Sequence, residues 1–193
     1  MSDRRNEILD VAKQIFAEMG VKATTVREIG AQAGILSGSL YHHFGSKLDM
    51  VDAILSDFCR EILEHYEAIV DSGDDAATRI RALARYAFSL IVEDRAALVM
   101  FFNEGRYLAA EPRFAYIGEF DRRIEAYWVD VLKAGVAEGQ IRPDVDTRLI
   151  FRVVRDTIGG AVHWYEPTKG RSIEAIADEF MDMFLRGILV RDD

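Results

Sequence analysis

The amino-acid sequence predicts an all-α protein of about nine helices, with a three-helix N-terminal head and a longer antiparallel helical body. Apolar residues recur at the three- and four-residue spacing of helices over most of the 193 residues. No stretch alternates valine, isoleucine and threonine as strands do, and the chain contains only 3 prolines. Hydrophobic residues make up 50% of the chain, which is enough for a packed core.

The chain carries no sequence feature of a secreted or membrane protein. Its single cysteine, Cys59, cannot form an internal disulfide, and Met1 is followed by charged residues rather than an apolar leader. No apolar stretch approaches the roughly 20 residues of a membrane span. We therefore expect a cytoplasmic protein with no membrane partner.

The negative charge lies entirely outside the head. The net charge is -9, yet residues 1–50 contain six basic and six acidic residues and are neutral, so the excess falls in residues 51–193. A neutral head on an acidic body can bind DNA if its cations gather on one face. Ordinary scatter of charges is the alternative reading.

The head shows helix start and stop signals in quick succession. A first helix is expected over residues 3–19, and Gly20 ends it because glycine adopts the left-handed conformation past a helix end. Thr25 and Glu28 then form a capping box, which predicts the start of a second helix. Gly34 is the expected stop of this helix.

A third, short helix is expected directly afterwards. Ser37 is its predicted N-cap, His43 its last residue, and Ser46 the N-cap of the helix that follows. Helix, glycine turn and short helix between Thr25 and Phe44 have the spacing of a helix-turn-helix unit.

The body is expected to contain six helices, and a domain boundary is expected after residue 46. The head would then be a DNA-binding domain of residues 1–46, and residues 47–193 a ligand-binding and dimerisation domain. The helices are expected near residues 47–70, 76–92, 95–102, 112–137, 145–165 and 172–190, with a loop at 106–112 and a break at 139–146.

Of the last two helices, the first is apolar nearly all round and the second carries an apolar stripe. We expect them to pack on their own body and on a twofold-related copy, as a four-helix interface. The predicted contacts are Ile158, Val162, Ile176, Phe180 and Phe184. The alternative is that these helices only complete a monomer core.

The segment around the third helix has the side chains that a DNA-reading helix needs. Small residues at 37–39 permit close approach to a duplex, and polar tips for bases and phosphates follow. Arg27 and Lys47 lie at helix starts, where the dipole disfavours a cation and a bound phosphate would explain one. The candidates from this reasoning are Arg27, Ser37, Ser39, Tyr41, His42, His43 and Lys47.

Metal and catalytic chemistry are not expected. Adjacent residues on a helix diverge by about 100°, so His42 and His43 cannot comfortably chelate one ion. No paired cysteines, nucleophile elbow, phosphate loop or dinucleotide motif accompanies them. We therefore expect no metal, no cofactor and no enzymatic activity.

Residues 24–55, TTVREIGAQAGILSGSLYHHFGSKLDMVDAIL, resemble the DNA-binding head of the tetracycline-repressor (TetR) family. The resemblance implies an obligate dimer with two heads, and a body whose ligand shifts the heads and releases the operator. By position, Arg27 and Ser39 match base-contacting places of the family. Thr25, Tyr41, His43 and Lys47 match phosphate-contacting places, and His42 lies at a groove-facing position where members vary.

A narrower resemblance lies in the body. GVAEGQIRPDVD (135–146) and FRVVRDTIGGAVHWY (151–165) resemble the KstR-type repressors of actinobacterial cholesterol catabolism, especially those that answer to CoA thioesters of steroid-ring fragments. This likeness implies that Arg155, Gly159 and His163 line the ligand pocket. Gly159 replaces a large aromatic residue of those relatives and His163 an arginine, which would enlarge the pocket. An ion pair between Arg155 and its neighbour Asp156 is the alternative role for the arginine.

The body also holds aromatic residues that are suited to a hydrophobic effector, although most such residues in helical proteins belong to the core. An arginine beside them would suit an anionic group. The remaining candidates for effector contact are Phe101, Arg106, Tyr107, Phe120, Tyr127 and Trp128.

Taken together, these features predict a homodimeric, ligand-responsive transcriptional regulator, most simply a repressor of lipid or steroid catabolism. Its partners would be a pseudo-palindromic double-stranded DNA operator and a small effector: an acyl-CoA thioester, a steroid fragment or another hydrophobic acid. The alternative from a different class is an all-helical carrier or enzyme whose head docks protein rather than DNA.

Overall fold

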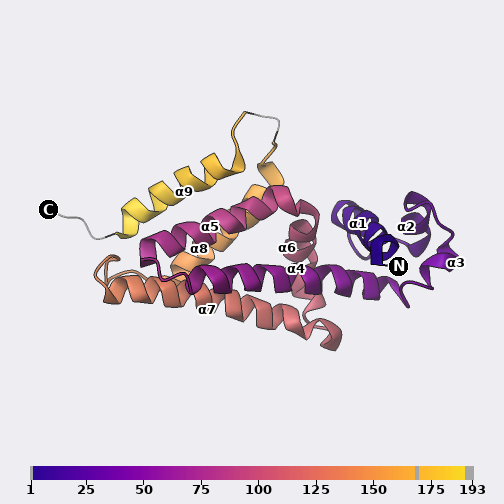
Figure 1. The fold of residues 1–193 in the computed structure, drawn as a ribbon, viewed down its shortest axis with the longest axis horizontal. Helices are drawn as coiled ribbons and strands as arrows, with labels where there is room; N and C mark the ends of the chain where they lie inside the picture. Colours follow the sequence, from indigo (N-terminus) through magenta and orange to yellow (C-terminus); the bar gives the residue numbers. More distant parts are fainter. Residues whose placement is uncertain (1, 168–169, 190–193) are drawn as a thin grey trace. The chain divides into compact units, whose positions relative to one another are not determined.

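The computed structural model of the protein describes residues 2–167 and 170–189, and in this part its regular structure is helical apart from one isolated antiparallel bridge between Ile141 and Leu189 (Figure 1). The all-α prediction of about nine helices is confirmed. The helices are α1 (Ser2–Met19), α2 (Val26–Gln32), α3 (Ser37–Leu40), α4 (Lys47–Val70), α5 (Ala76–Glu93), α6 (Arg95–Leu108), the short 3-10 helix η1 (Pro112–Phe114), α7 (Ala115–Ala137), α8 (Thr147–Trp164) and α9 (Ile173–Ile188).

The predicted boundaries differ from the structure chiefly at α3 and α6. The N-cap of α3 is Leu36 rather than Ser37, and α3 ends at Leu40, after which the chain turns through residues 41–43. Helix α6 reaches Leu108, where a loop was expected from residue 106, because Leu108 is buried and extends the apolar face of the helix. The predicted end of the last helix at Val190 lies outside the described residues.

Contacts divide the chain into two compact units, which we call unit 1 (Met1–Glu61 and Ala96–Glu119) and unit 2 (Ile62–Arg95 and Phe120–Asp193). Unit 1 therefore groups the head with the start of α4 and with α6. This grouping does not follow the expected boundary after residue 46, which was drawn by function. The functional division into residues 1–46 and 47–193 stays a prediction.

Helices α1, α2 and α3 share a small apolar core in unit 1. A close approach at Gly30 makes this packing possible, since a Cβ there would lie 3.0 Å from the Ile35 carbonyl oxygen and 3.3 Å from Leu40 Cδ1. Gly34, with φ of +66°, supplies the left-handed turn between α2 and α3. The fully or almost fully buried residues of this core are Ile8, Ala12, Ile15, Phe16, Ile29, Leu40 and Phe44.

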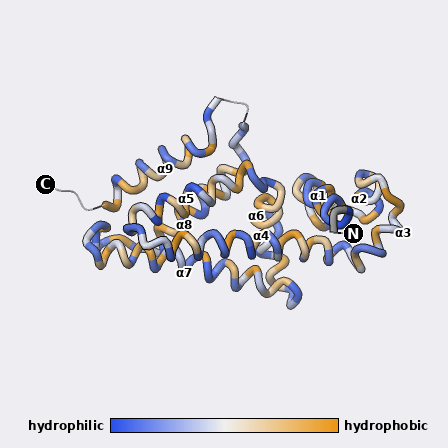
Figure 2. The backbone as a smooth tube through the Cα atoms, viewed as in Figure 1, coloured by the Kyte–Doolittle hydropathy of each residue, from blue (hydrophilic) through white to orange (hydrophobic). Residues whose placement is uncertain are grey.

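In unit 2, α9 runs beside α5, and α5 also packs on α8 (Figure 1). Figure 2 shows hydrophobic and hydrophilic residues interleaved along these helices, as expected for helices with one buried face. Two ion pairs join α5 to α9: Arg81 to Asp182 at 2.7 Å and Arg85 to Asp178 at 2.5 Å. The side chain of Asp178 is partly exposed, and its hydrogen bond from Arg85 lowers its pKa. None of the described helices combines the length and apolar character that crossing a bilayer requires.

Candidate nucleic-acid interface and effector site

The start of α2 is held by the capping box that the sequence predicts. Thr25 Oγ1 accepts from the Glu28 amide at 3.2 Å, and Glu28 Oε2 accepts from the Thr25 amide at 2.7 Å and from its hydroxyl at 2.8 Å. These bonds to the carboxylate lower the pKa of Glu28. The arrangement fixes the start of α2 and, with it, Arg27.

Arg27 projects from this fixed helix start. It is exposed and makes no hydrogen bond or ion pair with any residue that the structure describes. A guanidinium left free at the positive end of a helix gains nothing from folding. This exposure is what an arginine needs in order to reach a DNA base or phosphate.

We call the segment from Leu36 to His43 the reading segment. Buried side chains hold it to the head core, and most of its other side chains are exposed. Leu40 is fully buried and Phe44 is 3% exposed, so both side chains belong to the head core. The ring of Phe44 also carries the Arg5 guanidinium at 4.8 Å from its centroid. The exposed members are Leu36, Ser37, Gly38, Tyr41 and His42, while Ser39 and His43 are half-buried.

The structure thus brings most of the predicted DNA-binding residues together around α2 and the reading segment. Leu36 is a further exposed residue of this segment that does not belong to the predicted DNA-binding set. Its 80% exposure in the structure is the signal that distinguishes it.

Lys47 has a role in folding. Its Nζ donates to the carbonyl oxygens of Val21 and Thr24, both at 2.6 Å, and lies 3.5 Å from that of Lys22. The ammonium therefore ties the start of α4 to the turn between α1 and α2. A bound phosphate is therefore not needed to explain a lysine at this helix start, and the sequence reasoning missed these partners because they lie 23 and 26 residues earlier in the chain.

Within unit 1, two further contacts join the α6–η1 region to the turn after α1 and to the start of α4. Glu104 Oε1 of α6 accepts from the Val21 amide at 3.1 Å, in the same turn that Lys47 holds. Arg113 of η1 pairs with Asp49 of α4 at 2.6 Å. The head is therefore bonded to residues well outside the first 46.

The predicted effector residues fall in both units. In unit 1, Phe101 is buried and its ring lies 6.1 Å from that of Phe58, so it contributes to the packing of α4 and α6. Arg106 and Tyr107 of α6 are exposed, Tyr107 to 77%. Because they are exposed, these two side chains are not part of the core of unit 1.

In unit 2, the predicted aromatic residues belong to a cluster centred on Tyr66. Trp128 is 1% exposed and its Nε1 donates to the Tyr66 hydroxyl at 3.5 Å, while Tyr127 lies edge-on to Tyr66 at 6.3 Å. Burial raises the pKa of Tyr66, so its hydroxyl stays protonated. Phe120 is also buried. Tyr66 was not among the predicted effector residues, because its partners come from other helices, α5 and α7.

Arg155 of α8 pairs with Asp121 of α7 at 3.1 Å, and not with its neighbour Asp156. Both members of the pair are half-buried. Burial raises the pKa of Asp121, and the Arg155 guanidinium offsets this only in part. Along the same helix Gly159 is half-buried and His163 is exposed. No group of three or more potential metal ligands is present in the described part of the chain.

Helices α8 and α9 expose several large apolar side chains among their charged ones. Ile158 and Val162, two of the predicted dimer contacts, lie inside the subunit, with 6% and 0% exposed. Ile176, Phe180 and Phe184 are half-buried on α9. The exposed apolar residues of these two helices are Leu149 at 57%, Val153 at 46%, Trp164 at 58% and Met183 at 66%.

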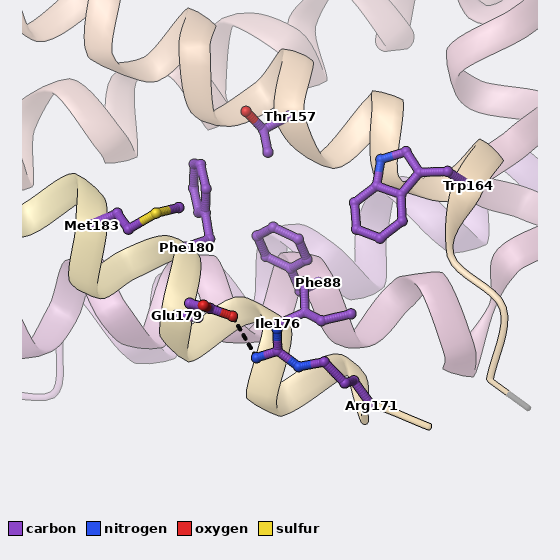
Figure 3. Close-up of a pocket in the computed structure, with 8 residues that line it drawn as sticks. All are labelled: Phe88, Thr157, Trp164, Arg171, Ile176, Glu179, Phe180 and Met183. Atoms are coloured by element: carbon purple, nitrogen blue, oxygen red, sulfur yellow. Dashed lines mark ion pairs between the residues drawn. The ribbon is translucent and has the colours of Figure 1, made fainter. Parts of the chain in front are cut away.

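The α8–α9 face contains a hollow of about 340 Å³ (Figure 3). Side chains from α5, α8 and α9 turn toward it, and Arg171 and Glu179 form an ion pair beside it. The predicted effector residues do not line it, whereas the predicted dimer contacts Ile176 and Phe180 do. Its lining consists of Phe88, Thr157, Trp164, Arg171, Ile176, Glu179, Phe180 and Met183.

A capped helix, a glycine turn and an exposed short helix on a three-helix head define a helix-turn-helix DNA-binding regulator. Comparison with known families agrees with this class. Residues 8–54 match the family described as bacterial regulatory proteins, tetR family, and residues 73–188 match a tetracyclin repressor-like C-terminal domain. The chain belongs to the TetR family of bacterial regulatory proteins.

The chain is also similar over nearly its whole length to named repressors. It is 42% identical to the HTH-type transcriptional repressor KstR2 of Rhodococcus jostii, over 97% of this chain and 92% of the relative. It is 41% identical to KstR2 of Mycobacterium tuberculosis, over 97% of this chain and 94% of the relative. The structure of that ketosteroid transcriptional regulator superposes with a TM-score of 0.94, covering 97% of this chain and 96% of the other.

These similarities confirm the resemblance to KstR-type repressors read from the sequence. The protein is a DNA-binding transcriptional regulator and not an enzyme, since its close relatives are transcriptional repressors of the same length and fold. The alternative of a carrier or enzyme with a protein-docking head is not favoured.

Proposed function

We propose that the protein is a homodimeric repressor that binds a pseudo-palindromic operator and leaves it when a hydrophobic acid or its CoA thioester occupies the body. The observation that carries this proposal is the exposure of the reading segment, which the buried side chains of Leu40 and Phe44 hold against the head core. The likeness to KstR2, one of whose structures is described as a ketosteroid transcriptional regulator, supports a steroid-derived effector. We infer a CoA thioester of a steroid-ring fragment as the first class to test.

In this proposal the residues around the reading segment make two kinds of contact with the operator. Arg27, Ser37, Ser39 and His42 contact base edges, which specify sequence. Thr25, Tyr41, His43 and Lys47 contact phosphates, which set position and affinity. Two of the three bonds from the Lys47 ammonium to carbonyls are short, and the third, to Lys22 at 3.5 Å, is the one that a phosphate would replace.

Replacing Arg27 with methionine is expected to weaken operator binding about 10- to 100-fold, because a guanidinium contact to a base or phosphate is lost. If the contact is to a phosphate, the slope of log K against log salt concentration falls by about 0.9. Binding to the intergenic DNA upstream of the protein's own gene, titrated at several salt concentrations, measures both quantities.

The matched control for this experiment is Arg186→Met, which removes an exposed arginine from α9 and leaves the head unchanged. We expect wild-type affinity and slope for this variant. Salt-independent binding by the wild-type protein, or none to any upstream fragment, would contradict the assignment of the head to DNA.

For dimerisation we propose the exposed α8–α9 face, with Ile176, Phe180 and Phe184 retained as contacts. Ile158 and Val162 support this face from inside the subunit. A Cβ added at Gly160 or Gly187 would meet no described heavy atom within 4 Å, so a partner helix has room to approach there. The exposed apolar residues of α8 and α9 complete a self-complementary patch of the kind a twofold interface needs.

For the effector we propose Arg155 as the group that binds its anion, with Gly159 and His163 on the same side of α8. The half-buried guanidinium pairs with the carboxylate of Asp121, and this pairing supports the proposal that an effector carboxylate or phosphate could bind it instead. Phe120, Tyr127 and Trp128 supply apolar surface in the same unit. Phe101, Arg106 and Tyr107 stay candidates from unit 1.

Arg155→Ala is expected to leave operator affinity within about twofold of wild type and to raise the effector concentration needed for release at least about tenfold. A charge-assisted contact to the effector is lost, whereas the head keeps all its bonds. Release is measured by fluorescence anisotropy of labelled operator against a panel of acyl-CoA thioesters and steroid acids.

Arg152→Ala is the matched control, since Arg152 lies one turn earlier on α8 and is exposed. We expect this variant to respond to effector as the wild type does. Loss of operator binding by Arg155→Ala, in place of loss of release, would assign Arg155 a structural role instead.

Release requires that effector binding in the body change the position of the head, and contacts within unit 1 could transmit this change. Glu104 and Arg113 contact the turn after α1 and the start of α4. A shift of α6 or η1 on effector binding would therefore be passed to the head through these bonds. A differential affinity of a few kcal/mol between the two states is enough for release.

A further inference from the structure

We propose that Leu36 contacts the C5-methyl group of a thymine in each operator half-site and is a sequence-specifying residue of the head. The inference rests on the proposed function, since it presupposes that the reading segment enters the major groove. It adds an apolar contact to the polar contacts proposed above.

Neither folding nor capping explains a leucine at this position. Leu36 is 80% exposed, the highest value among the large apolar side chains that the structure describes as exposed. It occupies the N-cap of α3 and makes no side-chain capping bond. N-cap positions favour serine, threonine, aspartate and asparagine, whose oxygen accepts from a free amide of the helix. The leucine gives up this bond and buries almost nothing within the subunit.

The backbone that carries Leu36 is firmly held. Its carbonyl oxygen accepts from the Ser39 amide at 2.8 Å and from the Leu40 amide at 3.3 Å, and the preceding Ile35 amide donates to Gly30 at 2.9 Å. The side chain therefore starts from a fixed point of the helix-turn-helix unit. Such support is what a residue needs to discriminate between bases.

The neighbours of Leu36 leave space for a duplex. Ser37 and Gly38 are exposed and short, and a Cβ added at Gly38 would meet no described heavy atom within 4 Å. Leucine is consequently the longest side chain at the start of the reading segment. Because Ser37 and Gly38 are short, the segment can approach a duplex closely, and the Leu36 side chain could then reach the floor of the groove.

The chemistry of leucine selects its target. The side chain has no donor or acceptor, so it gains nothing from phosphates or from the polar edges of bases. In the major groove, the C5-methyl of thymine is the apolar feature that distinguishes one base from the others. Burying that methyl against leucine is expected to favour thymine by about three- to tenfold per site.

The test removes that methyl group and nothing else. Operator sequences are first selected by the full-length wild-type protein from a random duplex library. Each thymine of the selected site is then replaced by uracil, which lacks only the methyl. For the wild type we expect one thymine position, repeated in both half-sites, to lose about three- to tenfold in affinity when replaced.

Leu36→Ala should bind the thymine and uracil forms equally at that position and keep the wild-type response at every other thymine. Leu36→Met, which retains an apolar side chain of similar length, should keep the penalty. Met19→Ala is the control, since it shortens another exposed apolar residue of the head, with 47% exposed in the wild type. It should give the wild-type profile.

A uracil profile of Leu36→Ala that matches the wild type at every thymine overturns the inference. So does a wild-type protein that shows no uracil penalty at any thymine. Failure to enrich any sequence from the library is a different result, because it overturns the proposed DNA-binding role itself.

Discussion

Met183→Glu is expected to turn the dimer into monomers and to abolish operator binding. Met183 is 66% exposed and lines the hollow on the α8–α9 face, beside Phe180. In a twofold interface each copy brings the same residue, so one substitution buries two carboxylates among apolar side chains. Burying a charge without a partner costs several kcal/mol, so we expect the dimer dissociation constant to rise at least about 100-fold.

The loss of DNA binding follows from the loss of the second head. A monomer can hold only one half-site, and its acidic body adds repulsion toward the phosphates, because the net charge of -9 lies outside residues 1–50. Sedimentation velocity over a range of protein concentrations measures the assembly state, and an operator titration of the same samples measures binding.

Val92→Glu is the matched control for Met183→Glu. Val92 is an exposed apolar residue of α5 in the same unit, with 50% of its surface exposed. The same charge introduced there should leave the dimer and its operator affinity unchanged. A Met183→Glu protein that remains dimeric at low concentration would show that α8 and α9 do not form the interface proposed here.

Lys47→Met is expected to destabilise unit 1 by about 2–3 kcal/mol, which lowers the midpoint of thermal unfolding by roughly 4–12 °C. Methionine keeps the length of the side chain and removes its ammonium. The carbonyl groups of Val21 and Thr24 then lose a charged donor at 2.6 Å. Thermal unfolding of the full chain, followed by circular dichroism without DNA, measures this effect.

Lys22→Met is the control, because Lys22 is an exposed lysine in the same turn whose ammonium holds no carbonyl. It should unfold within about a degree of the wild type. Equal midpoints for the two variants would refute the folding role of Lys47. Operator titrations then test its proposed phosphate contact separately: the salt slope should fall by about 0.9 for Lys47→Met.

The local features of the head could be predicted because their causes are local. The capping box joins Thr25 to Glu28, three residues apart, and any folded form of this stretch can make it. The helix stops at Gly20 and Gly34 depend on the conformational freedom of one residue, and both have positive φ. The apolar spacing likewise predicts which face of each helix is buried.

One error in the head concerns the N-cap of α3. Ser37 was chosen as the N-cap of α3 because serine is favoured there, yet the structure has Leu36 in that position. Tertiary packing of Leu40 into the head core sets the register of this short helix, and four residues of helix are too few for capping preference to override it.

The sequence by itself determined the helical class, the order of the helices, the helix-turn-helix head and the family, because all of these depend on residue spacing along the chain. Only the tertiary structure decided which partners the charged and apolar residues have. Lys47 meets carbonyls of the α1–α2 turn, Arg155 meets Asp121 rather than Asp156, and Val162 faces inward while Met183 faces outward. These outcomes depend on contacts between residues far apart in the chain, and periodicity within one helix cannot specify which neighbouring helix covers which face.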